Sequence, residues 1–478
     1  MQIYRTVLTL ALILVVQAVL FQPYLSEPFE RDEGAYAYIA QRLSSGELPY
    51  RDSYDHKPPM IYFIYASVFK FFGTSMAAIR SFTLLVSLLT TLAVFFLAWL
   101  ILGRFGAIVS ALLYAFYAGN PYIQGTSANT ETFMVLPMVL SLAFFLLALR
   151  REQKLGWLFL AGLCSGLAVM IKQVALLNFL VILGYYVFIC LRQRKDWSGV
   201  AALLIGLAVV PMLTVGYFFL KDAWSALLHG YLLENLLYVS RKVWVWPRLW
   251  LVLQELGLLW GLSALAIMLI WFNEKEDKFK IILAWALASG LGVFMGRAFY
   301  GHYFIQVVPA LAILAGYSLL KIAGSNWRLV LLAFLALIFS MDLFSRISFG
   351  LLSPELISQK KYGINNFVVA GQVAEFIKQK TLPKDRLFIW GAEPEVYFYS
   401  QRAAASHYIY YYPLLYKDKK SQQARLALLT ELKEAPPEYI IWVEPRVVYG
   451  PLLNYVKAGY NYLASFGRWQ IWRRKRIK

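Results

Sequence analysis

The most polar part of this strongly apolar chain is a short run of acids and bases close to its beginning. Asp32 and Glu33 are adjacent carboxylates, and His56-Lys57 is followed by two prolines. A carboxylate within hydrogen-bonding reach of a hydroxyl group can act as a general base. A lysine ammonium can hold a phosphate as a point charge, and His56 could orient a substrate or donate a proton. This stretch therefore suggests proton abstraction beside a cation that binds an anion.

Each of these residues also has a structural interpretation. Asp32 is well placed to cap a helix over residues 32–43, with Glu33 as a favourable acid in its first turn. A lysine beside a membrane, such as Lys57, often extends toward lipid headgroups. Neither motif decides between structure and chemistry by itself, so the residues around them must be considered.

Further polar residues lie in the turns that separate apolar segments. They are Glu131, Lys172, Arg297 and the pair His302-Tyr303. A carboxylate near lipid is costly unless it is paired or used, and the lysine and arginine could add cations to a phosphate site. The alternatives are a first-turn helix acid at Glu131 and interfacial anchors at the other positions. We expect all five residues to bind substrate if the fold places them beside the N-terminal acids.

The composition indicates that membrane helices position these residues. Of 478 residues, 60% are hydrophobic and 15% are charged, which is too little polar surface for a water-soluble globule of this length. The net charge of +19 would suggest nucleic acid for a soluble protein, but here much of the Lys and Arg lies in short connections, where it sets orientation. We predict the lipid bilayer as a partner and no nucleic acid. Cys164 and Cys190 both lie in apolar runs and are interpreted as packing residues.

Eleven apolar runs are close to the roughly 20 residues that cross a bilayer. They cover residues 6–22, 75–102, 105–119, 130–149, 156–171, 173–191, 198–220, 249–272, 279–296, 303–320 and 327–345. The first run lacks a convincing cleavage site, so we interpret it as an uncleaved anchor.

The connections between these runs predict the orientation. Alternate connections carry the basic residues, which the positive-inside bias assigns to the cytoplasm. The N-terminus is then cytoplasmic, and an odd number of spans places the chain after residue 345 outside. The predicted outer connections are the turn at Lys172 and residues 23–74, 120–129, 221–248 and 297–302. Every candidate functional residue falls on that side of a plasma (inner) membrane that the chain crosses many times.

The rest of the chain predicts two domains. Residues 1–345 form a transmembrane catalytic domain whose first external loop, 23–74, contains a helix over 32–43 and an interfacial helix beginning at Met60. Residues 346–478 form a small external α/β domain. Its expected helices cover 366–380 and 419–434, and its expected strands lie in "DRLFIWG" and "PPEYIIWVE". The predicted fold is a polytopic α-helical membrane protein with a C-terminal α/β domain.

Four segments carry a resemblance to a known family. They are "RDEGAYAYIAQRLSSGELPYRDSYDHKPPMIYF", "GLAVMIKQ", "GHYFIQVVPALAILAGYSL" and "FIWGAEPEVYFYSQR". Together they resemble bacterial members of the C-type superfamily of membrane glycosyltransferases, in the branch of protein O-mannosyltransferases and lipid A aminoarabinose transferases. The resemblance implies an inverting transferase that takes a sugar from a polyprenyl phosphate on the outer face of the membrane. It implies Asp32 as the base, Glu33 beside it and Lys57 at the donor phosphate. Aminoarabinose transferases often carry an acid before that lysine, where this chain has His56.

The candidate cations fit such a reaction. Fixed charges on Lys57, Lys172 and Arg297 would stabilise the phosphate as the sugar leaves, and a carboxylate would activate a protein, glycolipid or glycan acceptor. No cofactor and no metal are expected, because the spacing of the acids and histidines matches no local metal motif.

Two other functions remain open. One is a multi-pass lipid or sugar transporter or flippase, although most spans lack interior ionisable residues and the chain has no convincing repeat. The other is a non-catalytic receptor whose outer domain binds a partner, which leaves the first loop unexplained.

Overall fold

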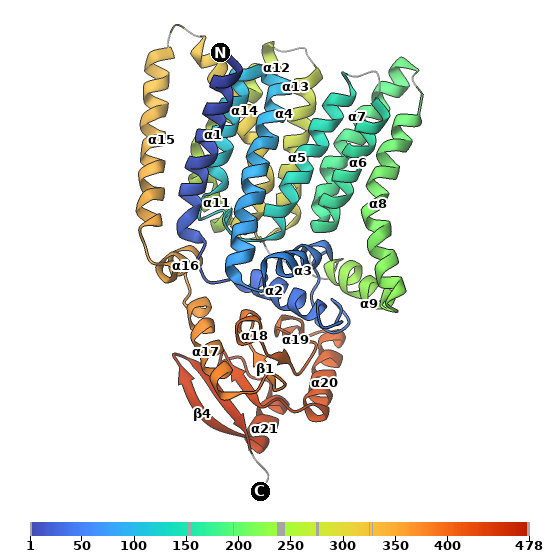
Figure 1. Cartoon of the computed structure of the whole chain (residues 1–478), viewed down its shortest axis with the longest axis vertical. Helices are drawn as coiled ribbons and strands as arrows, with labels where there is room; N and C mark the ends of the chain where they lie inside the picture. Colours follow the sequence, from blue (N-terminus) through green and yellow to red (C-terminus); the bar gives the residue numbers. More distant parts are fainter. Residues whose placement is uncertain are drawn as a thin grey trace.

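The structure is a computed structural model that describes residues 2–150, 154–194, 196–236, 244–273, 277–324, 326 and 328–475. A bundle of long helices forms one part of the molecule and a small α/β domain forms the other, with short helices between them (Figure 1). The N-terminus lies at the end of the bundle remote from the α/β domain (Figure 1). The predicted fold class, a polytopic helical membrane protein with a small C-terminal α/β domain, is confirmed.

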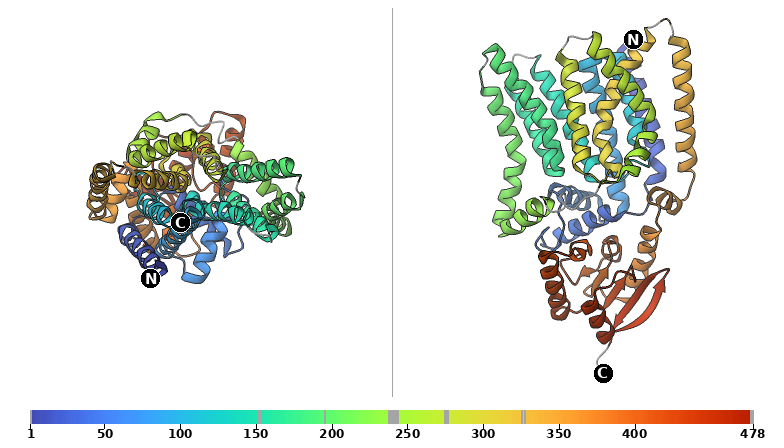
Figure 2. Two further views of the ribbon diagram at one scale, coloured as in Figure 1. Left: turned by 90° about the horizontal axis from the view of Figure 1, so that it is seen from above. Right: turned by 180° about the vertical axis from the view of Figure 1, so that it is seen from behind.

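Nine helical segments of the described residues are long and apolar enough to cross a membrane. Their main helices are α1 (Gln2–Phe21), α4 (Met76–Ala118), α5 (Thr130–Ala148), α6 (Lys154–Ile171), α7 (Leu176–Gln193), α8 (Ser198–Leu220), α13 (Asp277–Met295), α14 (Val308–Ala323) and α15 (Arg328–Gly350). Two more, α11 (Trp246–Glu255) and α12 (Gly257–Asn273), form a tenth span if taken together, with a bend of 82°. In two views, α15 stands at the edge of the bundle (Figures 1 and 2).

The 43 residues of α4 contain two helices that meet at Gly103. The φ angle of this glycine is 76°, a value that other residues rarely adopt. Arg150, at the end of α5, donates a hydrogen bond to the carbonyl of Leu100 near this turn. Tyr117, near the last residue of α4, instead contacts Asp342 in the second half of α15. The second and third predicted spans therefore form a hairpin inside α4.

Short helices cover the end of the bundle that faces the α/β domain. They are η1 (Gln22–Tyr24), α2 (Arg31–Leu43), α3 (Met60–Phe72), η2 (Gln173–Ala175), α9 (Trp224–Leu227), η3 (Leu228–Leu233) and η4 (Gly301–Val307). The expected helices of the first external loop correspond to α2 and α3. Both carry a buried apolar or aromatic face.

The capping interpretation of Asp32 is wrong. The N-cap of α2 is Glu30, whose carboxylate accepts a hydrogen bond from the backbone N–H of Glu33 at 3.2 Å. The Glu33 carboxylate accepts one from the Glu30 N–H at 3.1 Å, which completes a capping box. These two glutamates satisfy the end of the helix, so the Asp32 side chain is available for other contacts.

The α/β domain contains a five-stranded sheet with the order β2-β1-β3-β5-β4. Its strands are β1 (Arg386–Trp390), β2 (Ala403–Ala404), β3 (Tyr439–Trp442), β4 (Tyr460–Phe466) and β5 (Trp469–Arg474). β1 pairs in parallel with β2 and β3, and β5 is antiparallel to β3 and β4. Its helices are α16 (Pro354–Tyr362), α17 (Asn366–Lys380), α18 (Glu395–Ser400), α19 (Tyr412–Leu415), α20 (Lys419–Glu434) and α21 (Gly450–Gly459). The predicted strands and both predicted helices are present.

Candidate functional site

The N-terminus of α2 and the loop before α3 bring Asp32 and Lys57 into contact. The Lys57 Nζ atom lies 2.9 Å from the Asp32 Oδ2 atom. Both side chains are partly accessible, at 30% for Asp32 and 14% for Lys57. The Tyr36 hydroxyl, one turn along α2, lies 3.5 Å from the same carboxylate. The two residues at the centre of the sequence hypothesis are therefore neighbours, although they are 25 positions apart.

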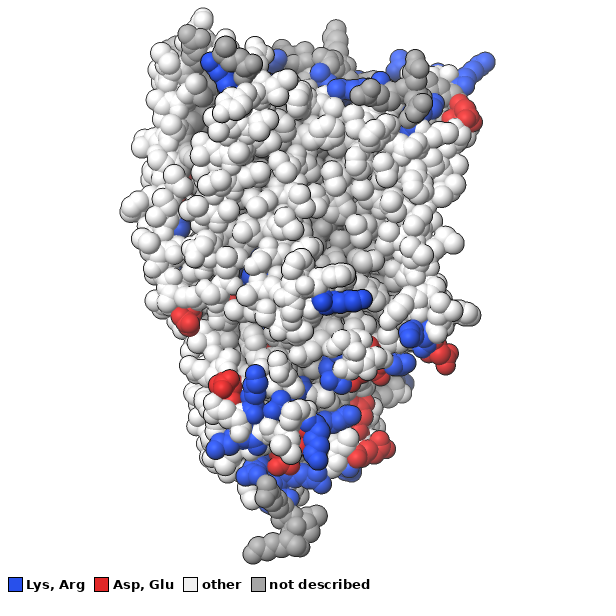
Figure 3. All heavy atoms as spheres, viewed as in Figure 1, with Lys and Arg blue, Asp and Glu red and all other residues white. Residues whose placement is uncertain are grey.

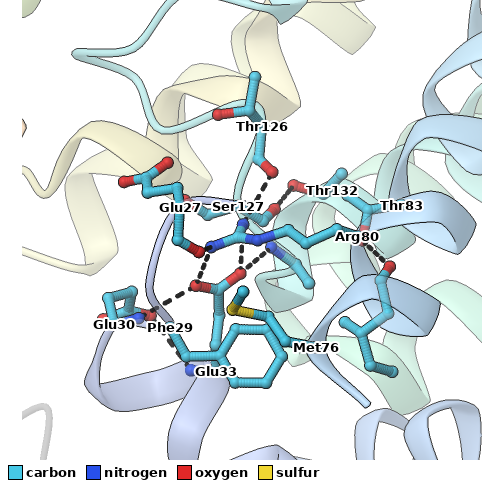
Figure 4. A network of polar contacts seen from close by, with 12 residues as sticks. Glu27, Phe29, Glu30, Glu33, Met76, Arg80, Thr83, Thr126, Ser127 and Thr132 are labelled. Atoms are coloured by element: carbon cyan, nitrogen blue, oxygen red, sulfur yellow. Dashed lines mark hydrogen bonds and ion pairs between the residues drawn. The ribbon is translucent and has the colours of Figure 1, made fainter. Parts of the chain in front are cut away.

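Glu33 points away from this contact. Its carboxylate pairs with Arg80 of α4 at 2.6 Å, and both side chains have zero exposure. Figure 4 shows the two groups facing each other, with backbone groups around them. The Arg80 guanidinium also donates to the carbonyls of Thr126 and Glu27, and the Ala128 N–H donates to Glu33 at 2.6 Å. Glu33 thus holds α2 to the membrane helices.

Glu131, Lys172, His302 and Tyr303 form a second cluster. Lys172 forms an ion pair with Glu131, whose side chain is 1% exposed. His302 Nε2 lies 3.9 Å from the same carboxylate, and the Lys172 ammonium lies 4.3 Å from the centre of the Tyr303 ring. Four residues from three separate parts of the sequence therefore converge, as the sequence hypothesis requires.

A cavity of about 760 Å³ lies at the junction of the bundle, the connections between its helices and the α/β domain. Of the residues selected from the sequence, the ones that line it are Asp32, His56, Lys57, His302 and Tyr303. The α/β domain contributes Tyr410 and Tyr412 to its wall. Glu33, Glu131, Lys172 and Arg297 are not among the lining residues. Glu131 and Lys172 nevertheless contact the wall through His302 and Tyr303.

Arg248 lines the cavity and Arg297 does not. Arg297 lies in a turn with a φ angle of 53°, and its carbonyl accepts a hydrogen bond from the N–H of Val245 at 3.4 Å. Arg248, in the first turn of α11, stacks on the ring of Tyr300 at 4.3 Å. Within the described residues, no carboxylate lies within ion-pair distance of its guanidinium. Arg248 is the last residue of the predicted connection 221–248, and nothing in its sequence position distinguishes it as a residue of the cavity.

The carboxyl groups on the cavity wall have pKa values that are shifted in opposite directions. Burial by itself would raise the pKa of Asp32, but the charge of Lys57 beside it holds that pKa well below its usual range. Burial, reinforced by the charges of Asp32 and Glu33, raises the pKa of Glu30 to about 8. Burial also raises the pKa of Asp55. Of these three acids, Asp32 is the one whose pKa is lowered, so it stays ionised at neutral pH, as a general base must.

Other residues of the wall also escaped the sequence analysis. Glu30 and Arg31 directly precede the acidic pair, and Asp55 precedes His56, so proximity in the sequence was a usable signal. Asp55 is 3% exposed and accepts hydrogen bonds from the Tyr410 hydroxyl and from the His56 N–H. The tyrosines of the α/β domain gave no such signal, because only the fold brings them to the loop. Among the described residues, no group of three or more His, Cys, Asp or Glu could hold a metal ion.

Comparisons with known proteins agree with this architecture. The sequence profile described as dolichyl-phosphate-mannose-protein mannosyltransferase matches residues 56–215, about a third of the chain. Comparison with curated protein sequences gave no significant match. The crystal structure of ArnT from Cupriavidus metallidurans bound to undecaprenyl phosphate is similar, with a TM-score of 0.68 and 18% identity over 98% of this chain and 97% of that chain.

Two further solved structures are similar. Apo ArnT from the same organism has a TM-score of 0.65 and 17% identity, with 97% of each chain covered. The archaeal oligosaccharyltransferase AglB from Archaeoglobus fulgidus, in complex with an inhibitory peptide and a dolichol-phosphate, has a TM-score of 0.54 and 11% identity over 92% of this chain and 69% of that chain. These values establish the fold, and the resemblance found in the sequence is confirmed at that level.

Proposed function

We propose that this chain is a glycosyltransferase that moves a sugar, with inversion, from a polyprenyl-phosphate donor to an acceptor of the cell envelope. The observation that carries the proposal is the contact of Asp32 with Lys57 on the wall of a cavity between the bundle and the α/β domain. Support comes from the similar folds, one solved with undecaprenyl phosphate and another with a dolichol-phosphate. The acceptor is a protein, a glycolipid or a glycan.

The proposed reaction needs one base. Asp32 accepts the proton of an acceptor hydroxyl group, and the hydroxyl oxygen forms a bond to the anomeric carbon of the sugar. The bond from that carbon to the phosphate oxygen breaks, and its electron pair stays on the phosphate. Polyprenyl phosphate leaves as an anion, so no second carboxylic acid is needed to protonate it, in contrast to most glycosidases.

Lys57 and Arg248 are the proposed cations for that phosphate. They line the same cavity, and fixed positive charges stabilise a developing anion most when water is excluded. When the donor phosphate attracts Lys57, Asp32 loses part of the charge that depresses its pKa. Its proton affinity then rises as the substrate arrives, which makes it a better base. Arg248 replaces Arg297 in this proposal.

The cluster of Glu131, Lys172, His302 and Tyr303 is proposed to bind the sugar and support the cation site. His302 and Tyr303 reach the cavity, and His56 lines it beside Lys57. Glu131 and Lys172 act from behind through their contacts with those two residues. Glu33 is proposed to position α2, since Arg80 occupies its carboxylate.

The site is proposed to face the outside of a plasma (inner) membrane. The N-terminus and the α/β domain lie at opposite ends of the bundle (Figure 1). On the face shown in Figure 3, Lys and Arg gather at the end of the bundle remote from the α/β domain and on that domain, while the bundle surface between them carries few charges. The basic end of the bundle fits the cytoplasmic side. The basic residues of the α/β domain do not oppose this orientation, because whole domains are translocated largely regardless of charge.

The position of the cavity favours a transferase over a transporter. Transporter sites commonly lie near the middle of the membrane, at discontinuous helices. Most of the residues that line this cavity come from the connections outside the spans and from the α/β domain. A lipid-linked donor can reach such a site from the outer leaflet, and a polar acceptor can reach it from water.

The proposal is tested by transfer in liposomes. The purified protein is reconstituted with radiolabelled polyprenyl-phosphate sugars, tested one at a time, and with an envelope fraction from the source cells as acceptor. We expect label from at least one donor to move to the water-soluble or glycolipid acceptor fraction, and Asp32→Asn to stop this movement. Transport of label across the bilayer without cleavage of the sugar–phosphate bond would instead support the transporter.

A further inference from the structure

The α/β domain contacts the residue that directly precedes Asp32. The Arg31 Nε atom donates a hydrogen bond of 2.6 Å to the carbonyl of Ala392, in the loop between β1 and α18. Its Nη2 atom lies 3.9 Å from the Glu393 carboxylate. This loop belongs to the segment "FIWGAEPEVYFYSQR" that marked the family resemblance, and the proposed reaction gives it no role.

Glu393 is a fixed partner. Its side chain is 3% exposed, and its two oxygens accept hydrogen bonds from the Asn366 side chain at 2.7 Å and from the Ala392 N–H at 2.5 Å. Surface ion pairs contribute little because both side chains are free to move. Here the carboxylate is already oriented before it meets Arg31, so the contact can determine where the N-terminus of α2 lies.

A second contact brings α2 close to the same loop. A Cβ atom on Gly34 would lie 2.5 Å from the Cβ of Glu395 and 2.6 Å from its backbone nitrogen, so only glycine fits this approach. Glu395 has zero exposure, and burial raises its pKa well above the usual value. A protonated, neutral carboxyl group can pack against α2 at a smaller cost than a charged one.

The other side of α2 is held by the membrane domain. Glu33, which directly follows Asp32, forms the buried pair with Arg80 of α4. Asp32 therefore lies between one residue anchored in the α/β domain and one anchored in the bundle. A small shift of either anchor would change the distance between Asp32 and Lys57.

We infer that Glu393 and Arg31 are positioning residues which, across the domain junction, hold Asp32 in reach of Lys57 and of the acceptor. This inference rests on the proposed function and gives the α/β domain a role in that same site. If the loop only stabilised the contact between the two domains, loss of Glu393 would lower the stability of the protein and leave the kinetics of the folded protein unchanged.

The test compares Glu393→Gln and Arg31→Gln with Glu438→Gln in full-length protein. Glu438 pairs with Arg473 at 3.6 Å in the same domain, so its variant removes a similar charge elsewhere. We expect Glu393→Gln and Arg31→Gln each to lower kcat by about tenfold or more, since a shift of about 1 Å in a catalytic group can cost about a hundredfold. The donor KM should change by less than about twofold, because Lys57 and Arg248 still line the cavity.

Two further measurements separate positioning from stability. The double variant should lose no more kcat than either single variant, because the two residues act as one unit. The acidic limb of the pH profile should move to higher pH in both single variants, since an Asp32 that leaves Lys57 loses the charge that depresses its pKa. If kcat is unchanged in Glu393→Gln and Arg31→Gln, or if only KM changes, the inference is overturned. The proposed function is tested separately by Asp32→Asn.

Hydrogen exchange supplies a readout that needs no activity. Amide exchange in the peptide covering residues 30–36 should be faster in Glu393→Gln than in Glu438→Gln, at equal protection of the bundle peptides. Equal exchange in the two variants overturns the inference. If wild-type protein transfers sugar from none of the donors, the proposed function fails, and this comparison alone decides whether the loop holds α2.

Discussion

Asp32 and Glu33 are consecutive residues whose carboxylates pair with different cations. Successive residues of an α-helix point about 100° apart, so one side chain reaches the cavity and the other reaches the interior. Asp32 is 30% exposed and meets Lys57, whereas Glu33 has zero exposure and meets Arg80. An acidic pair in a sequence can therefore combine one chemical residue with one structural residue.

The first prediction concerns the base. Asp32→Asn should lower kcat by about 10²–10⁴-fold, because that is the usual contribution of a general base. The asparagine keeps the size of the side chain and removes its ability to take a proton. The matched control is Glu375→Gln, an exposed carboxylate on α17 that accepts a hydrogen bond from the Gln379 side chain. Both are measured by transfer of radiolabelled sugar, and an Asp32→Asn enzyme with the control rate would eliminate this base.

The second prediction concerns pH. The pKa of Asp32 is depressed by Lys57, so in wild-type protein the base stays ionised as the pH falls to about 4, the usual value for this side chain. The profile of kcat/KM should then show no acidic limb from Asp32 above about pH 4. In Lys57→Ala, burial remains and the opposing charge is lost, so the pKa of Asp32 rises and the limb should move to higher pH. If the normalised pH profiles of wild type and Lys57→Ala coincide, Lys57 does not control the pKa of Asp32 and the prediction is wrong.

The site was partly predictable at the level of residues. Asp32 and Lys57 share one loop, so their types and their short separation were enough to expect a contact. Arg248 and Arg297 were interchangeable by type, since both lie near the ends of apolar runs. Only the local backbone distinguishes them, because the turn at Arg297 directs its carbonyl to Val245 and α11 presents Arg248 to the cavity.

At the scale of elements, the buried pair of Glu33 and Arg80 joins α2 to α4. Removing one partner leaves an uncompensated charge in the interior, which typically costs about 3–5 kcal/mol. We therefore predict that Arg80→Met destabilises the protein strongly and that the double variant Arg80→Met with Glu33→Leu recovers part of the loss. Thermal unfolding in detergent measures both. A single variant as stable as wild type would show that this pair does not hold the helix.

The contact of α2 with α18 gives the fourth prediction. Gly34→Ala places a Cβ within 2.5 Å of Glu395, and overpacking of this kind typically costs about 1–3 kcal/mol. We expect a lower melting temperature together with a lower kcat, because the helix that carries Asp32 must shift. Gly371→Ala in α17 is the control, since no atom lies within 4 Å of its added Cβ. Alanine in that helix should be neutral or stabilising by up to about 1 kcal/mol.

The elements that sequence reasoning located best were those with a strong pattern. The amphipathic helices α17 and α20 begin and end where expected, and the apolar runs all fall on helices. The 82° bend between α11 and α12 was missed. Gln254, Glu255 and Gly257 interrupt the apolar run at the bend, but one short interruption in a run of this length does not specify the angle between two helices. A contact from outside the run, the bond from Asn120 to Glu255, accompanies it.

For the whole molecule, the main feature is the cavity at the junction of the two domains. The cavity has walls from the bundle loops and from the α/β domain, so neither domain alone contains the full site. The change from apolar runs to mixed patterns after residue 345 is pronounced, so the sequence predicts both domains. It could not foresee that tyrosines of the second domain would face the loop of the first, since nothing in a one-dimensional pattern reports the docking of two folded units.

The proposed orientation can be tested on the intact molecule. Cys164 and Cys190 are first replaced by alanine, which gives a parent without native thiols. Lys417→Cys places a thiol on the α/β domain, and Arg192→Cys places one in the last turn of α7. Both positions are exposed. Arg192 lies about 24 Å from Leu176, the first residue of α7, along the helix axis, given the rise of about 1.5 Å per residue, and therefore at the other end of the bundle from the cavity.

A membrane-impermeant maleimide should label Lys417→Cys on intact cells and should label Arg192→Cys only after the membrane is opened. The expectation follows because the basic connections remain in the cytoplasm, and an outward-facing cavity can receive an acceptor that is exposed outside the cell. If the maleimide labelled only Arg192→Cys on intact cells, the site would face the cytoplasm and the proposed orientation would be wrong. The Asp32–Lys57 contact would still exist in that case, but a cell-envelope acceptor could no longer reach it.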